Sequence, residues 1–211
     1  MFSRTIDILG SKSFKKINNS TIVVCGLGGV GSYTATSLAR SGVGSLILVD
    51  FDKIDKSNIN RQEFAYISTI GKYKTDLARE IIKDINPECN VTCITEKITQ
   101  PTFEADFVID AIDDVPAKIK LAKAYNGKII SCMGTAQRIN PEKLTYADIY
   151  ETKVCPLCKA FRKEARKADI KSLPVVYSTE TAIKGEGLGS TSFVPPVAGF
   201  MLASYAVRQL I

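Results

Sequence analysis

The stretch Val23-Val24-Cys25-Gly26-Leu27-Gly28-Gly29-Val30-Gly31 decides the fold class of this chain. It joins a β-branched run at residues 21–26, which reads as a buried strand, to a helix that we expect from about Val30 to Ser41. Gly26, Gly28 and Gly31 have G-x-G-x-x-G spacing, which lets the backbone turn tightly and approach a phosphate at a helix N-terminus. A purely structural glycine turn has the same pattern, so the loop predicts a nucleotide site without identifying the nucleotide.

The segments after this loop alternate between short apolar strands and amphipathic helices. The sequence predicts strands at residues 46–50, 91–94, 107–110 and 128–132, and helices at residues 74–85 and 116–125. Such alternation is typical of a parallel sheet with right-handed crossovers. We therefore predict an α/β fold, a Rossmann-like and mostly parallel sheet with helices on both faces.

The pattern becomes irregular after Gly134. Residues 181–192 are rich in Gly and Ser and predict a mobile loop, and Pro195-Pro196 begins a last helix that packs back on the sheet. We expect one domain over residues 1–211, with a nucleotide-binding core at 1–134 and substrate-side elements and the last helix at 135–211.

Composition narrows the chemistry. The chain has 211 residues, 45% of them apolar, six cysteines, no histidine and a net charge of +6. The missing histidine excludes Ser-His-Asp and Cys-His catalysis and histidine-bearing metal sites, whereas charge-stabilised phosphate chemistry needs no histidine. The thiols fit a reducing compartment, and we see neither a secretion signal nor a membrane-spanning run, so we expect a cytoplasmic protein with no membrane partner.

Charged residues downstream of the loop indicate which nucleotide binds. Asp50 ends the second strand, where an acid can bind ribose hydroxyls. Arg61 and Lys74 follow, and their charges can neutralise a triphosphate, whereas a dehydrogenase needs no cation in this segment. Their alternative role is that of solvated surface charges. Three carboxylates follow the fourth strand, those of Asp110, Asp113 and Asp114. Such carboxylates can hold Mg²⁺ or cap the N-terminus of a helix.

Cys155-Pro156-Leu157-Cys158 has the spacing of half a zinc site. A zinc site without histidine needs four thiolates, and no second C-x-x-C exists in the chain. We therefore expect no zinc here. A reactive or a structural thiol pair remains open.

These motifs together resemble a known family. G-L-G-G-V-G, V-D-F-D, S-N-I-N-R-Q, a lysine 13 positions beyond that arginine, and D-A-I-D-D are similar to the MoeB/ThiF/HesA adenylating enzymes, relatives of ubiquitin-activating enzymes. The resemblance covers nearly the whole chain. It implies an enzyme with the ubiquitin-activating-enzyme-like adenylation fold, which uses ATP and Mg²⁺ to adenylate a carboxylate.

The resemblance also implies roles for individual residues. Arg61, Lys74 and Asp113 would be catalytic, the last by holding Mg²⁺ against ATP. Arg4 would be a fourth catalytic residue that acts on a partner subunit, which implies a homodimer. The residues implied to bind ATP are Gly26, Gly28, Gly29, Gly31, Asp50, Asp52, Asn58, Arg61, Gln62, Lys74, Asp113 and Asp114.

Within that family the chain looks like the tRNA threonylcarbamoyladenosine dehydratase subgroup. Phe2-Ser3-Arg4-Thr5 and Ser192-Phe193-Val194-Pro195 are two of the segments that resemble it. The implied reaction adenylates the threonylcarbamoyl carboxylate of certain tRNAs and then closes it intramolecularly into a ring. That reaction requires no protein nucleophile. The basic run at residues 159–171 would contact tRNA phosphates or else form a solvated helix face, and its cations are Lys159, Arg162, Lys163, Arg166 and Lys167.

Three alternatives stay open at this point. One is activation of a ubiquitin-like sulfur carrier at its C-terminal Gly-Gly, as in MoeB or ThiF; a cysteine desulfurase or sulfur acceptor is a further expected partner of the chain, beside tRNA, and does not depend on this alternative. The missing second C-x-x-C and the basic run argue against sulfur-carrier activation. Another is an NAD-dependent oxidoreductase, which leaves Arg61, Lys74 and Asp113 without a role. The third is a module that binds ATP without catalysis.

Overall fold

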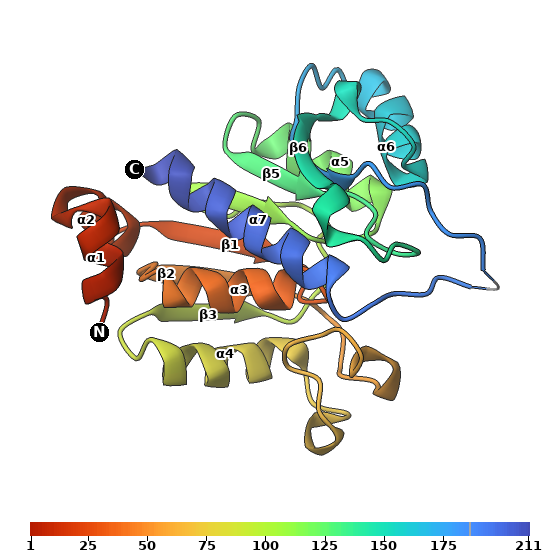
Figure 1. The fold of residues 1–211 in the computed structure, drawn as a ribbon. Coiled ribbons are helices and arrows are strands. Elements are labelled where there is room, and N and C mark those ends of the chain that lie inside the picture. Colours follow the sequence, from red (N-terminus) through yellow and green to blue (C-terminus); the bar gives the residue numbers. More distant parts are fainter. Residues whose placement is uncertain (186) are drawn as a thin grey trace.

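The computed structural model describes residues 1–185 and 187–211, which form an α/β fold around one seven-stranded sheet (Figure 1). The strand order is β3-β2-β1-β4-β5-β7-β6, and only the β6–β7 pair is antiparallel among the described residues. The order reverses between β1 and β4, and ligands bind outside the carboxyl ends of the strands at such a reversal. The strands are β1 Thr21–Cys25, β2 Ser45–Val49, β3 Asn90–Ile94, β4 Phe107–Asp110, β5 Ile129–Cys132, β6 Leu144–Asp148 and β7 Pro174–Ser178.

Helices cover both faces of this sheet. Their bounds are α1 Ser3–Leu9, α2 Ser11–Asn18, α3 Gly31–Arg40, α4 Lys74–Ile85, α5 Val115–Ala124, α6 Pro156–Lys167 and α7 Val194–Leu210. Side chains of α3, α4 and α7 join the apolar core on one face, and those of α5 and α6 join the core on the other. The sequence of β1 is apolar because both faces of this strand are buried. Ile22 and Val24 pack into the core beneath α3, α4 and α7, and Val23 and Cys25 pack into the core beneath α5 and α6.

The contact between α3 and α7 fixes the start of α3 (Figure 1). A Cβ at Gly199 of α7 would lie 2.4 Å from the carbonyl oxygen of Val30, so only glycine allows this approach. The hydroxyl of Thr34 donates to the carbonyl of Gly199 over 3.1 Å. The last helix therefore holds the glycine loop in place from a point far away in the sequence.

The predicted fold class, with helices on both faces of a mostly parallel sheet, is confirmed. The sequence did not predict α1, α2 or the β6–β7 pair. The division at residue 134 stays a prediction, and β5 pairs with β7 across it. The described part of the predicted loop at 181–192 contains no helix or strand, and its Glu186 lies outside the described residues. No helix in the described ranges combines the length and the apolar character that a membrane span requires.

Candidate nucleotide site

The glycine loop joins β1 to α3 at the carboxyl edge of the sheet. Gly26 has φ +87°, and a Cβ there would lie 2.8 Å from the carbonyl oxygen of Ala111. A Cβ at Gly31 would lie 1.8 Å from the carbonyl oxygen of Gly26. Gly28 differs, since the nearest atom to its added Cβ would be Nε2 of Gln62 at 4.0 Å. Two glycines therefore serve the turn, and the third leaves space next to the N-terminus of α3, where a phosphate is favoured.

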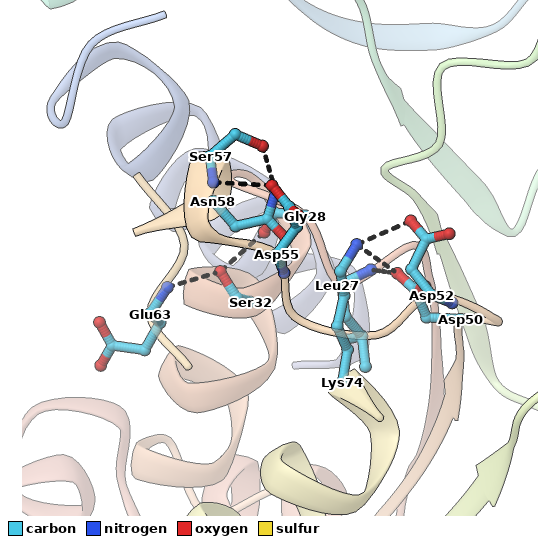
Figure 2. A network of polar contacts seen from close by, with 10 residues as sticks. All are labelled: Leu27, Gly28, Ser32, Asp50, Asp52, Asp55, Ser57, Asn58, Glu63 and Lys74. Carbon is cyan, nitrogen blue, oxygen red and sulfur yellow. Dashed lines mark hydrogen bonds and ion pairs between the residues drawn. The ribbon is translucent and has the colours of Figure 1, made fainter. Parts of the chain in front are cut away.

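Asp50 and Lys74 lie in a network beside this loop (Figure 2). The Asp50 carboxylate accepts the backbone N–H of Leu27 over 2.6 Å and that of Asp52 over 2.8 Å. The ammonium of Lys74 lies 2.8 Å from Asp52 Oδ2 and 3.9 Å from Asp50 Oδ2. The pKa of Asp50 is raised, because burial outweighs the charge of Lys74 and the two backbone donors, which lower it. Asp50 thus fixes the loop and places an acceptor at the edge where a ribose would bind.

The segment after β2 crosses over the glycine loop. Ser32 connects the two, because its hydroxyl donates to the carbonyl of Gly28 over 2.7 Å and accepts the N–H of Glu63 over 3.2 Å (Figure 2). A Cβ at Gly29 would lie 3.1 Å from Cγ of Arg61, so the arginine stem runs along the loop. The sequence reasoning missed Ser32; a small hydroxyl one residue past the last glycine is a signal that could have identified it.

Three of the predicted ATP-binding residues lie in this segment, and two of them make local hydrogen bonds within it. The guanidinium of Arg61 donates to the carbonyl of Ser57 and to the side chain of Asn60, both over 2.9 Å. The Asn58 side chain accepts the N–H of Asp55 over 3.1 Å and so caps the short 3₁₀ helix Lys56–Asn58. Gln62 is buried, and its Oε1 has no hydrogen-bond partner in the described part of the chain. A buried amide with an unused oxygen beneath the loop fits a site built for a polar ligand.

The three acids past β4 have three different environments. Asp110 is fully buried and pairs with the ammonium of Lys118 at 2.9 Å, so it is not available to a metal as the sequence had suggested. Asp114 caps α5 by accepting the N–H of Ala117 over 2.9 Å. Asp113 is exposed at the same edge of the sheet. Among the described residues no three His, Cys, Asp or Glu side chains gather into a metal-binding group. Mg²⁺ in nucleotide sites needs only one or two carboxylates besides the phosphates, so Asp113 fits that role.

Arg4 lies at the other end of the molecule. The Phe2 ring packs against the Phe14 ring in a tilted arrangement, with 5.5 Å between ring centroids, and a Cβ at Gly42 would lie 2.6 Å from the Phe14 ring. Gly42 follows the C-terminal end of α3, whereas the glycine loop precedes its N-terminal end, about 15 Å away. Figure 1 shows α1 at that far end of the sheet. Arg4 is therefore remote from the glycine loop of its own chain.

The basic run forms one face of α6. Cys158, Phe161 and Ala165 of this helix are buried, while Lys159, Lys163, Arg166 and Lys167 are exposed. Arg162 differs from the other predicted tRNA contacts. Its Nη1 donates to the carbonyls of Ile149 and Thr152 over 3.3 and 3.1 Å, and to the Thr152 hydroxyl. Its position gives Arg162 a structural role and leaves the four exposed cations as candidates.

The thiols of the C-x-x-C motif are buried and free. Cys155 precedes α6, and Cys158 lies in its first turn. A hydrogen bond from the Cys158 thiol, backbone N–H groups of Cys158 and Gly134, and the charge of Arg138 lower the pKa of Cys155 to about 5, against the effect of burial. The same thiol–thiol contact raises the pKa of Cys158. This contact therefore favours ionisation of Cys155 over that of Cys158.

Comparisons with known proteins agree with this geometry. The model of the ThiF family matches residues 2–211. A Bacillus subtilis (strain 168) protein named tRNA threonylcarbamoyladenosine dehydratase is 38% identical, over 100% of this chain and 94% of its own. A solved Escherichia coli structure of tRNA N6-threonylcarbamoyladenosine dehydratase, TcdA, in complex with ATP superimposes with a TM-score of 0.92 at 29% identity, covering 99% of this chain and 93% of its own.

A relative from the alternative class covers less of the chain. The molybdopterin-synthase adenylyltransferase of Salmonella typhimurium is 30% identical over 74% of this chain and 63% of its own. The similarity thus favours the dehydratase interpretation over sulfur-carrier activation. Because the family model spans all but the first residue, this chain belongs to the ThiF family.

Proposed function

We propose that this protein is an ATP-dependent tRNA threonylcarbamoyladenosine dehydratase. The observation that carries the proposal is the joint position of the open space at Gly28, the buried pair of Asp50 and Lys74, and Arg61 along Gly29, all at the reversal of strand order. Relatives with this name match the chain end to end, and one of them has been solved with ATP. The substrate carboxylate would be adenylated with release of pyrophosphate, and ring closure would follow within the substrate.

The residues of the site would act through charge and position. Gly28 and the first turn of α3 would hold phosphate oxygens, and Asp50 would accept a ribose hydroxyl. Arg61 and Lys74 would stabilise negative charge on the leaving pyrophosphate, and the burial of Lys74 limits the screening of its charge by water. Asp113 would hold Mg²⁺, which neutralises phosphate charge when bound. No step requires a histidine or a nucleophilic thiol.

The proposal includes a homodimer and an RNA surface. Arg4 is remote from the glycine loop of its own chain. In the proposed dimer it would therefore contact the ATP phosphates in the nucleotide site of the partner subunit. The exposed cations of α6 would bind tRNA phosphates, and the proposed location is the cytoplasm, with which a tRNA substrate is compatible. Residues 1–134 would then carry the nucleotide and 135–211 the substrate. A cysteine desulfurase or sulfur acceptor is a further proposed partner, and co-purification would test it.

An exchange assay tests this function. ATP–pyrophosphate exchange should require threonylcarbamoylated tRNA, and conversion of that tRNA to the cyclic form should require ATP and Mg²⁺. The same tRNA without the modification is the matched control. Exchange driven by a ubiquitin-like sulfur carrier instead of tRNA would overturn the proposal in favour of the other branch of the family, and ATP binding without exchange would indicate a non-catalytic module.

A further inference from the structure

A cavity of about 230 Å³ lies beyond the carboxyl end of β5. One wall is formed by residues 137–139, and the other by described residues of the loop between β7 and α7. Three glycines of that loop, Gly185, Gly187 and Gly189, line the cavity, and an added Cβ at any of them would meet no atom within 4 Å. The three glycines therefore leave free space in that wall beside the side chains of Ile183, Ser190 and Thr191, and the volume fits a group smaller than a drug-sized ligand.

Gln137 holds the loop over the cavity. Its backbone N–H donates to the carbonyl of Gly189 over 2.8 Å, and its side chain donates to that of Gly187 over 2.9 Å. Gln137 has φ +59°, an unfavourable conformation for a residue with a side chain, which this set of contacts maintains. On the far side, Asn60 donates to the carbonyl of Ser190 over 3.0 Å. Asn60 is the neighbour of Arg61, so the loop connects the cavity to the proposed phosphate site.

Arg138 brings a buried positive charge to this cavity. The residue is only 3% exposed, and Nη1 donates to the carbonyl of Ala136 over 2.7 Å. Nε and Nη2 have no hydrogen-bond partner within the ranges that the structure describes. The nearby Glu180 carboxylate is engaged elsewhere, because it accepts the N–H groups of Ile139 and Asn140 over 3.2 and 3.0 Å. The charge of Arg138 favours ionisation of Cys155 and so has a partial counter-charge there, but that sulfur takes its hydrogen bond from Cys158 and none from Nε or Nη2 of Arg138.

A buried guanidinium with two unused donors is costly unless a ligand completes it. Its planar array of N–H groups matches a carboxylate, which can accept two parallel hydrogen bonds. We propose that Arg138 binds the carboxylate of the threonylcarbamoyl group in this cavity and so presents it next to the phosphate site. The inference rests on the proposed function and adds a residue for substrate selection, distinct from the residues that bind ATP.

Binding measured without ATP, so that no reaction occurs, tests this role. The probes are threonylcarbamoylated tRNA and the same tRNA without the modification. The wild-type protein should prefer the modified tRNA, and Arg138→Gln should reduce that preference by about 10- to 100-fold, the loss expected for hydrogen bonds to a charged group. Arg138→Lys keeps the charge but lacks the planar donors, so it should lose part of the preference. Arg208→Gln, an arginine stacked on Tyr146 near the end of α7, is the matched control and should keep it.

The outcomes separate this inference from the proposed function. An unchanged preference in Arg138→Gln and Arg138→Lys would overturn the role of Arg138 and leave the dehydratase proposal standing. A wild-type protein without any preference would overturn the role of Arg138, while the exchange assay would still decide the dehydratase proposal. Loss of ATP affinity with an intact tRNA preference would show that Arg138 serves a nucleotide phosphate, which also refutes the proposal. If Arg138→Gln does not fold, Arg138→Lys decides, because it retains the charge and most of the volume.

Discussion

Replacing Lys74 with methionine should reduce stability as well as activity. Lys74 and Asp50 have side chains only 5% and 7% exposed, and their charged atoms are 3.9 Å apart. At an effective dielectric constant of about 20, that attraction is roughly 4 kcal/mol. Asp50 keeps its two backbone donors in the variant, and Asp52, the closer partner of Lys74, is half exposed, so part of the loss is compensated.

The expected cost of Lys74→Met is therefore about 3 kcal/mol of unfolding free energy, or roughly 6–12 °C in Tm for a chain of this size. Asp50→Asn in the same chain removes the unpaired carboxylate, and the double variant should lie within about 1 kcal/mol of the wild type. Urea unfolding without nucleotide measures both. ATP–pyrophosphate exchange should fall by orders of magnitude in the single and the double variant, because each lacks the charge that stabilises pyrophosphate.

Two results would refute this reasoning. If Lys74→Met is as stable as the wild type, the buried pair does not contribute to the fold. If the double variant regains exchange along with stability, Lys74 acts only by supporting the structure. Arg61→Ala is the matched control for stability, since within the described residues the Arg61 guanidinium donates hydrogen bonds only to the nearby groups of Ser57 and Asn60. It should unfold within about 1 kcal/mol of the wild type and still lose exchange.

Three further perturbations test other parts of the molecule. Gly31→Ala should prevent folding because its Cβ would lie 1.8 Å from a carbonyl oxygen, whereas Gly28→Ala, with 4.0 Å of space, should fold and lose ATP affinity; equal stability of the two in thermal unfolding would contradict this. The ultraviolet absorbance of thiolates should show a step at about pH 5, and Cys155→Ser should abolish this step. The lowered pKa of Cys155 should also stabilise the fold: its contribution should be complete above the ordinary thiol pKa of 9.0 and should be lost as the pH falls through about 5. Three exposed lysines of α6, Lys159, Lys163 and Lys167, can be replaced together by glutamine. The slope of log affinity for tRNA against log salt concentration should then become shallower by about 2 to 3. An unchanged slope would show that the RNA binds elsewhere.

The local pattern was sufficient for the parallel half of the fold. β1, β4 and β5 are short runs buried on both faces, β2 is a largely buried apolar run, and α4 has one apolar face, so each element is visible in its own segment. The β6–β7 pair escaped prediction because β6 carries only one fully buried residue and gains its place by pairing with β7, about 30 residues away.

The sequence by itself determined the glycine turn, the positions of Asp50, Arg61 and Lys74 along the chain, and the resemblance that leads to ATP. These features depend on residue type and spacing, which a linear chain displays. Only the tertiary structure decided how charge is distributed among the acids and arginines. In the folded protein Asp110 is buried in an ion pair with Lys118, and Arg162 donates hydrogen bonds to backbone carbonyl groups. Arg138 is buried beside a cavity, and two of its N–H-bearing nitrogens have no hydrogen-bond partner among the described residues. Burial and partners set the energy of a charge, and both come from segments that are distant in sequence and adjacent only after folding.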